Sequence, residues 1–212
     1  NAIRACDRRH ERDRWQLGEL HGPLPALTSA VASFASTAAP FFLGACAGAI
    51  ASGRLRARPS GSEFLTGWIG PLSIWSAFFG VGVCAYLAAV YLTREAEIAG
   101  EADLTELWRR RAIGTGLWMG VLSAAGLALL WTEAPALRDR FAERSGPLVA
   151  ASAVFGALSI LLLWRRRFTL AAFSAALTVS AVLWGWAVAQ YPDLLPGQVS
   201  LQDAKAPDAV LR

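Results

Sequence analysis

The sequence predicts an all-α fold, a polytopic transmembrane helix bundle with about five membrane-spanning helices. Five stretches contain no Asp, Glu, Lys, Arg or His and approach or exceed the roughly 20 apolar residues that a helix needs to cross a lipid bilayer. Only 17% of the residues are charged, against about 25% in typical soluble domains. Backbone groups in lipid must bond within their own segment, which favours helices, and the alternation of barrel strands is absent. The expected spans are Thr28–Ile50, Trp68–Leu92, Ala112–Trp131, Pro147–Trp164 and Phe168–Gln190.

The segment before the first expected span, residues 1–27, begins with a basic, polar stretch. Residues 1–16 have no apolar core of the kind that a signal peptide carries, so we do not interpret them as one. Because the chain begins with Asn1, we expect it to be a fragment of a longer protein that lacks its true N-terminus. Nucleic acid is not an expected partner, because the arginines flank apolar runs and no nucleic-acid-binding motif is present.

Lys and Arg are divided unevenly between the two sides of the predicted bundle. Twelve lie on the side of the N-terminal segment and eight on the other side. The side richer in Lys and Arg usually faces the cytoplasm. We therefore expect residues 1–27 to be a cytoplasmic segment, residues 28–190 to form the bundle, and residues 191–212 to lie outside.

Small residues indicate where helices approach one another in lipid. Gly44 and Gly48 form a GxxxG motif in the first span, and Gly116 and Gly120 form another in the third. Both motifs are common, and we interpret them as general helix–helix contacts. Pro40 lies in the middle of the first span and should kink that helix.

Two connections on the expected cytoplasmic side differ in length. Residues 93–111 have a helical, amphipathic pattern with Glu106 and Arg110 spaced as an i,i+4 ion pair, and we expect them to lie on the membrane surface. Only Arg165–Arg167 separate the fourth span from the fifth. Two helices joined so closely must be antiparallel neighbours.

Aromatic residues lie at or near the ends of the expected spans, as they do at membrane–water interfaces. The last span ends in WGWAVAQY, after which Pro192 and Pro196 prevent the helix from continuing. The aromatic residues at span ends are Trp68, Tyr91, Trp131, Trp164, Trp186 and Tyr191.

We expect no residue of this chain to be catalytic, to bind a cofactor or to bind a metal. The spans lack the ionisable groups that proton relays use. His10 and His21 precede the first span and should be solvated, and Met119 should pack within a helix rather than ligate a haem. The cysteines show no metal-binding spacing, and we expect Cys46 and Cys84 to be small buried residues.

Four segments, in order and with matching spacing, resemble subunit II of cytochrome bd-type quinol oxidases, including the cyanide-insensitive branch. The most recognisable is VLWGWAVAQYPDLLPGQVSLQDAKAPDAVLR, in which a Trp-rich helix end precedes AQYP-x-LLP and a segment rich in Asp and Ala. The resemblance covers residues 39–212 and is weakest in the third and fourth spans. The segments are APFFLGACAGAIASGR (39–54), WIGPLSIWSAFFGVGVCAYLAAVYLTREAE (68–97), LWRRRA (107–112) and the one above (182–212).

The resemblance implies a non-haem subunit of an enzyme that oxidises quinol and reduces dioxygen to water in the bacterial inner (cytoplasmic) membrane. Two haems b and one haem d would belong to subunit I, the expected partner, and none to this chain. The family subunit has more spans than five, so residues 191–212 would lead to a last helix that is missing here. Acidic residues proposed for proton entry lie in N-terminal helices that this chain lacks, so no residue role is transferred.

The residues alone leave two other functions open, a fragment of a membrane transporter and a non-enzymatic membrane assembly protein. Transporters tend to have broken helices and polar groups near the middle of the membrane, whereas the expected spans offer only small Ser and Thr side chains there. An assembly protein would be recognised by a stable partner that holds no haem.

Overall fold

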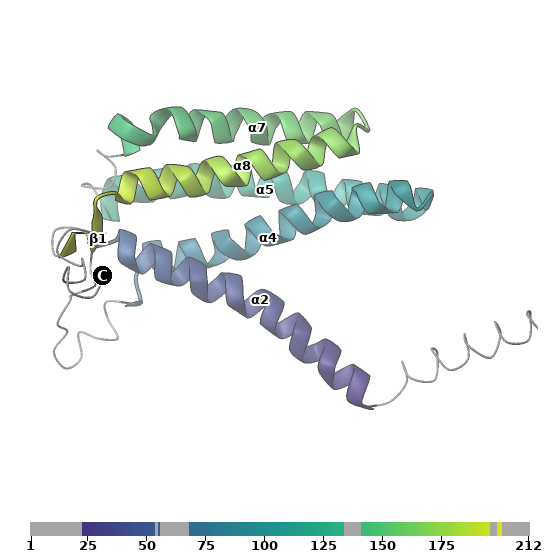
Figure 1. Ribbon diagram of the computed structural model, residues 1–212, viewed down its shortest axis with the longest axis horizontal. Coiled ribbons are helices and arrows are strands. Elements are labelled where there is room, and N and C mark those ends of the chain that lie inside the picture. The colour runs from purple at the N-terminus through teal and green to yellow at the C-terminus, as the bar shows by residue number, and fades with distance from the viewer. Residues whose placement is uncertain (1–22, 54, 56–67, 134–140, 196–198, 201–212) are drawn as a thin grey trace, which may run out of the picture. The chain divides into compact units, whose positions relative to one another are not determined.

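The computed structural model of the chain describes residues 23–53, 55, 68–133, 141–195 and 199–200 (Figure 1). Within this part, five helices are long and apolar enough to cross a membrane, which confirms the predicted all-α membrane fold. The helices are α2 (Pro23–Ala51), α4 (Pro71–Ile98), α5 (Ala102–Glu133), α7 (Gly146–Trp164) and α8 (Phe168–Gln190). The shorter elements are the π-helix η1 (Phe141–Ser145) and the antiparallel strands β1 (Asp193–Leu195) and β2 (Val199–Ser200).

The chain divides into two compact units, residues 1–39 and residues 40–212, so that α2 contributes to both. In the first unit, Ser36 and Thr37 donate their hydroxyl protons to carbonyls one turn earlier in the same helix. α2 continues as a helix through Pro40, with which the second unit begins. The kink expected at Pro40 stays a prediction.

The second unit contains two helical hairpins. α4 packs along α5 and α7 packs along α8, while α8 also contacts α4 and α5 contacts α7. The α4–α5 turn and the α7–α8 turn lie at the same end of this unit, on the right of Figure 1. The predicted antiparallel pairing of the fourth and fifth spans is confirmed.

The connection between α4 and α5 is much shorter than the sequence suggested. Residues 93–98 and 102–111 are helical as predicted, but they are not a separate surface helix, because α4 continues to Ile98 and α5 begins at Ala102. Most of these residues favour helix formation until Gly100, whose φ of +76° takes up the left-handed conformation that ends α4. The N–H of Glu101 donates to the carbonyl of Ala96 and closes the helix end.

The α7–α8 turn closes in the same way, with an arginine where glycine is usual. The N–H of Arg167 donates to the carbonyl of Leu162 at 2.9 Å, and the N–H of Arg166 donates to that of Leu163 at 3.2 Å. Arg166 has a φ of +56°, which costs a residue with a side chain about 1 kcal/mol. The turn thus holds arginine at three consecutive positions, 165 to 167, and the left-handed conformation of Arg166 adds only a small conformational cost.

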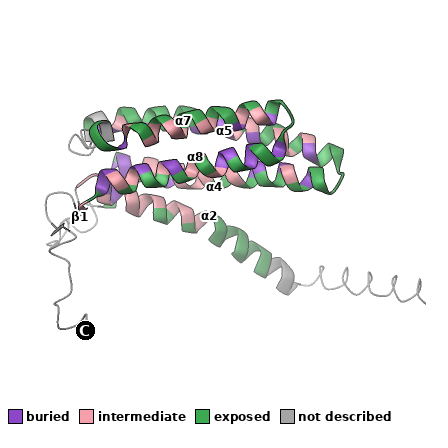
Figure 2. Cartoon of the chain, turned by 45° about the horizontal axis from the view of Figure 1, so that its top comes forward, coloured by how far each residue is buried: buried purple, intermediate pink, exposed green. Residues whose placement is uncertain are grey.

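The buried residues of the second unit are largely small, whereas many large apolar residues are exposed. Figure 2 shows the buried residues in purple and the exposed residues in green along the helices. Phe173 and Trp184 of α8 are each 67% exposed. Soluble proteins bury such residues, whereas helix bundles in lipid place small residues where helices meet. The main buried cluster comprises Tyr86, Ala89, Val90, Ala112, Met119, Leu163, Phe168, Ala171, Ala172 and Ala175.

Aromatic residues expected at the membrane surfaces are mostly exposed. Trp68, Tyr91, Trp164 and Tyr191 are exposed and Trp186 is half-buried, while the side chain at position 131 lies outside the described part. Tyr91 is about two turns before the end of α4. An aromatic residue at the end of an expected span therefore does not mark the end of the helix.

Candidate functional site

Polar side chains join neighbouring helices of the second unit through backbone carbonyls. The hydroxyl of Ser73 on α4 donates to the carbonyl of Ala45 on α2 at 2.8 Å. Nε1 of Trp75 donates to the carbonyl of Leu122 on α5 at 3.1 Å. A carbonyl has two lone pairs, so it can accept such a bond besides its own helical one. These bonds fix how far each helix can slide along its neighbour.

A buried chain of hydroxyl groups connects α4, α7 and α8. The hydroxyl of Tyr86 donates to Oγ of Ser159 at 2.8 Å, and Oγ of Ser159 donates to the carbonyl of Ala171 at 2.9 Å. Ser174 makes a similar bond to the carbonyl of Phe155. Sequence spacing does not indicate these hydroxyl contacts, although a phenol within an apolar span was a signal. Its geometry fits a structural role, because it ends at a backbone carbonyl.

Removing the two hydroxyls of this chain should have unequal effects. Tyr86→Phe leaves Ser159 bonded to Ala171 and should cost about 0.6 kcal/mol. Ser159→Ala leaves a buried phenol without its partner and should cost about 1–3 kcal/mol. The double variant should then be more stable than Ser159→Ala alone, as thermal unfolding of the purified protein in detergent would show. If the stability loss of the double variant equals the sum of the two single losses, the hydrogen-bonded chain of hydroxyl groups is contradicted.

The first GxxxG motif is a place where two helix backbones meet. A Cβ at Gly48 would lie 2.6 Å from the carbonyl oxygen of Leu72 on α4. A Cβ at Gly44 would overlap the carbonyl oxygen of Ser76 on the same helix. Backbone atoms cannot rotate away as side chains can, so both glycines are required for this approach of α2 and α4.

The second GxxxG motif of the predicted set behaves differently. Gly116 faces the ring of Tyr86, where a Cβ would lie 2.9 Å from the ring atom Cε2. Apart from its chain neighbours and the nearby backbone of its own helix, no atom of the described residues lies within 4 Å of where a Cβ at Gly120 would be. The general helix contact expected there is therefore present at Gly116 and absent at Gly120.

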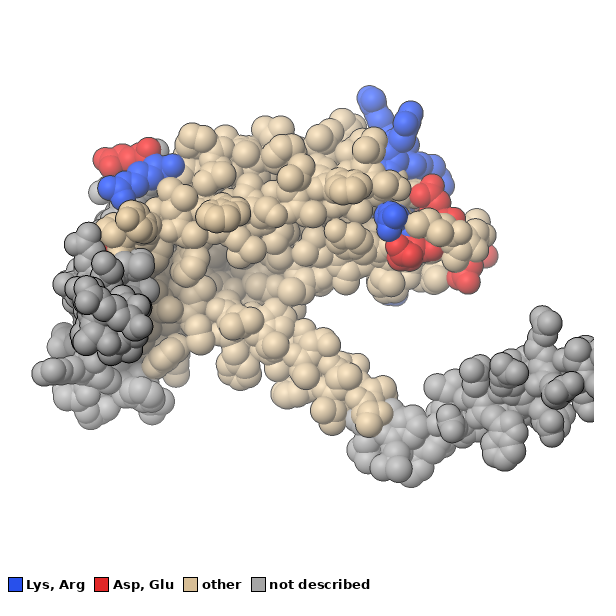
Figure 3. Space-filling model, in the orientation of Figure 1, with Lys and Arg blue, Asp and Glu red and all other residues tan. Residues whose placement is uncertain are grey.

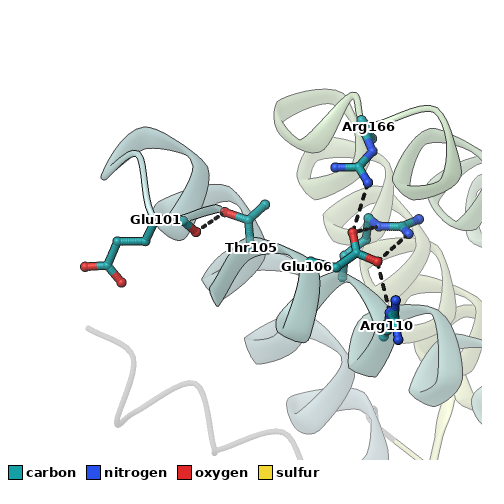
Figure 4. A network of polar contacts seen from close by, with 6 residues as sticks. Glu101, Thr105, Glu106, Arg110 and Arg166 are labelled. Carbon is teal, nitrogen blue, oxygen red and sulfur yellow. Dashed lines mark hydrogen bonds and ion pairs between the residues drawn. The ribbon is translucent and has the colours of Figure 1, made fainter. Parts of the chain in front are cut away.

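One carboxylate at the start of α5 binds three arginines (Figure 4). Oε1 of Glu106 accepts from Nη2 of Arg109 at 2.8 Å and from Nε of Arg110 at 3.0 Å, so the predicted i,i+4 pair is confirmed. Oε2 accepts from Nε of Arg109 at 2.9 Å and from Nη2 of Arg166 at 3.0 Å. Since Arg166 belongs to the α7–α8 turn, Glu106 ties the two hairpins together.

The charges of the described residues lie at the ends of the helices. In Figure 3, blue and red side chains gather at the two ends of the second unit, and the face between them that this view shows is uncharged. Three guanidinium groups around one carboxylate leave an excess of positive charge at the Glu106 cluster. The Glu106 cluster itself can therefore attract anions.

Glu106→Gln should loosen the contact between the hairpins. The amide keeps the size of the side chain but removes the charge that holds three cations together, so Arg109 and Arg166 will repel each other. We expect faster hydrogen–deuterium exchange in residues 102–111 and 164–169, with a smaller difference at high salt because the groups are partly exposed. Glu97→Gln is the matched control, since Glu97 is exposed at the same end. Equal hydrogen–deuterium exchange rates in the Glu106→Gln and Glu97→Gln variants would contradict the ion-pair link between the two hairpins.

Gln190, the last residue of α8, has a buried amide without a hydrogen-bond partner among the described residues. Both its Nε2 and its Oε1 are unpaired, and the residue is 8% exposed. Its neighbour Ala189 belongs to a small apolar cluster with Ala51, Leu72 and Leu130. A buried unpaired amide costs free energy unless something else bonds to it.

Gln190→Met tests whether the unpaired amide lowers the stability of the protein or makes a stabilising contact. Methionine has a similar shape and needs no hydrogen bond, so we expect the isolated protein to gain about 1 kcal/mol in stability. Thermal unfolding measures this effect, and Gln190→Ala, which leaves a void, is the control. A loss of stability in the methionine variant would show that the amide is hydrogen-bonded in the isolated protein, and would contradict its lack of a partner among the described residues.

Among the residues considered as possible ligands, the structure describes Met119, Cys46 and Cys84. Met119 lies in the main buried cluster, as expected for a packing residue. Cys84 is exposed and Cys46 is half-buried, so the prediction of two buried thiols is wrong. An apolar span indicates contact with lipid as readily as contact with protein, and Cys84 lies on an outward side of α4. Outside the described residues lie Cys6, His10 and His21.

Comparison with known protein families gives one finding for the whole bundle. The model of the family "cytochrome bd terminal oxidase subunit II" matches residues 24–212. No curated protein matches the chain. The matched range contains every contact described above, and within the described residues no group of three or more His, Cys, Asp and Glu could hold a metal ion.

Proposed function

The chain belongs to the cytochrome bd terminal oxidase subunit II family, and on this premise we propose that it is the non-haem membrane subunit of a quinol:oxygen oxidoreductase. Membership makes it part of an oxidase complex with subunit I. In this proposal the chain scaffolds subunit I, which holds haem b and haem d, and the complex oxidises quinol and reduces dioxygen to water in aerobic respiration. The family match over residues 24–212 carries the proposal.

The contacts within the second unit support a scaffolding role. Hydroxyl and indole groups such as those of Ser73, Trp75 and Tyr86 bond to neighbouring helices. Large apolar side chains face outwards, where lipid or a partner subunit can cover them. In this proposal the chain supplies no catalytic, cofactor-binding or metal-binding residue.

The proposed location is the bacterial inner (cytoplasmic) membrane, with the α4–α5 and α7–α8 turns in the cytoplasm. Those two turns and the adjoining helix ends carry seven arginines, which is the bias expected of cytoplasmic connections. Residues 1–27 would then also be cytoplasmic, and residues 191–212 would lie on the outer side. The arginines are Arg94, Arg109, Arg110, Arg111, Arg165, Arg166 and Arg167.

A spectrum of the complex isolated through this chain tests the proposal. The chain is tagged and purified from membranes in mild detergent, and a reduced-minus-oxidised absorption spectrum is recorded. We expect bands of haem b and haem d, together with quinol-dependent oxygen consumption. A preparation that holds a stable partner but no haem d would overturn the assignment, and the same purification from cells without subunit I is the control.

A further inference from the structure

The α7–α8 turn presents two arginines that no acidic group of the described residues binds. Arg165, Arg166 and Arg167 are all exposed, and of these only Arg166 reaches the carboxylate of Glu106. The turn and the Glu106 cluster together hold five arginines and one glutamate. In Figure 3 blue side chains gather at the upper right, over the end where α7 and α8 meet, and red side chains lie below them.

Exposed apolar side chains run from this turn along both helices. On α7, Val154, Leu158 and Leu161 follow an i, i+4, i+7 spacing, which places them on one face that ends at the exposed Trp164. On α8, an i, i+3, i+7 spacing likewise gives a single exposed face. Its residues are Leu170, Phe173 and Leu177.

We propose that the α7–α8 turn is a binding site for an anionic glycerophospholipid, whose phosphate is held by Arg165 and Arg167 while its acyl chains lie along the exposed faces of α7 and α8. Guanidinium groups bind phosphate oxygens through paired N–H donors, and a Trp ring beside them suits the headgroup layer. Basic sites between helix ends on the cytoplasmic side of membrane proteins recognise such headgroups.

The combination of charge and apolar surface favours a lipid over a protein partner. A lipid needs cations at one end and a continuous uncharged strip beginning at that point, and both are present here. An acidic protein segment would use the arginines but would leave the two apolar faces uncovered. The inference does not depend on the oxidase role, because it follows from the turn and the helices beside it.

Retention of lipid by the purified complex tests the site. The complex is reconstituted in nanodiscs with equal amounts of phosphatidylglycerol and phosphatidylcholine, extracted into detergent, and its bound lipids are counted by native mass spectrometry. We expect the unaltered protein to retain phosphatidylglycerol selectively. Each arginine near an anionic headgroup contributes about fivefold in binding, so the double variant Arg165→Ala, Arg167→Ala should lose about twenty-fivefold.

Two further variants separate this site from a general effect of charge. The double variant Arg94→Ala, Arg110→Ala removes two cations at the same end that are already paired with Glu95 and Glu106, and it should retain the lipid. The double variant Arg165→Lys, Arg167→Lys keeps the charge but loses the paired N–H geometry, so its retention should be intermediate. The lysine variant also keeps the test decisive if the alanine variant does not assemble.

Several results would overturn the proposal. One is that the alanine variant retains as much phosphatidylglycerol as the unaltered protein, and another is that the Arg94, Arg110 control loses as much lipid as the alanine variant. The other two contradicting results are displacement of the lipid by inorganic phosphate alone and release of subunit I rather than of lipid. The haem spectrum of each variant, recorded in parallel, distinguishes failure of this site from failure of the proposed oxidase role.

Discussion

Gly44→Ala is expected to separate α2 from α4 and to lower the yield of the assembled protein sharply. The added Cβ would overlap the carbonyl oxygen of Ser76 and lie 3.0 Å from the Cα of Ala77, so that a helix backbone would have to move. Overpacking in a well-filled interior costs about 1–3 kcal/mol, and we expect a value at the upper end because neither partner is a flexible side chain. Gly48→Ala and the larger Gly44→Leu should act in the same direction.

Gly120→Ala is the control for this experiment. It makes the same chemical change at a helical glycine where no described atom would meet the new methyl group. Alanine favours a helix over glycine by about 1 kcal/mol, so this variant should be as stable as the unaltered protein or slightly more stable. The yield of the complex and its thermal midpoint in detergent are the measurements. Equal behaviour of the Gly44 and Gly120 variants would contradict the close contact of α2 with α4.

Replacing Arg165–Arg167 together by Glu is expected to prevent correct insertion of the α7–α8 hairpin. Cytoplasmic cations at a short connection help to set the orientation of the helices that it joins, and the substitution also breaks the ion pair of Arg166 with Glu106. Each cation near the cytoplasmic leaflet favours that side of the membrane by about fivefold. The fraction of protein with the correct orientation should therefore fall by at least about tenfold.

Labelling of a cysteine introduced near the turn, from either side of sealed vesicles, measures this orientation. The triple substitution Arg165–Arg167 to Lys keeps all three charges and should insert normally, which makes it the matched control. A glutamate variant that inserts fully but is inactive would show that the arginines serve the reaction rather than the topology.

The hydropathy pattern was sufficient for the fold, because each span is defined by its own composition. The ends of α4 and α5 were predicted less well. Charges at Arg94 and Glu95 end the apolar run but do not end the helix, because a helix can continue into water as long as its residues favour helical conformation. What ends α4 is the left-handed Gly100.

The contacts of the candidate site could be predicted only where both partners lie on one helix. The spacing of Glu106 and Arg110 indicated their pair, but Arg166 is 60 residues from Glu106 and joins it only through the packing of the hairpins. Tyr86 and Ser159 are 73 residues apart and were missed for the same reason. Likewise, a GxxxG pattern does not reveal whether another helix lies against it.

The small residues of the interior have a consequence for how stability depends on temperature. Heat-capacity changes of unfolding come mainly from apolar surface that becomes exposed to water. Large side chains such as Phe173 already face outwards, and in a membrane or micelle they would keep hydrocarbon neighbours when the helices part. Helix separation then transfers little apolar surface to water, so the association free energy should change almost linearly on heating or cooling, without the marked curvature that gives soluble proteins a temperature of maximum stability.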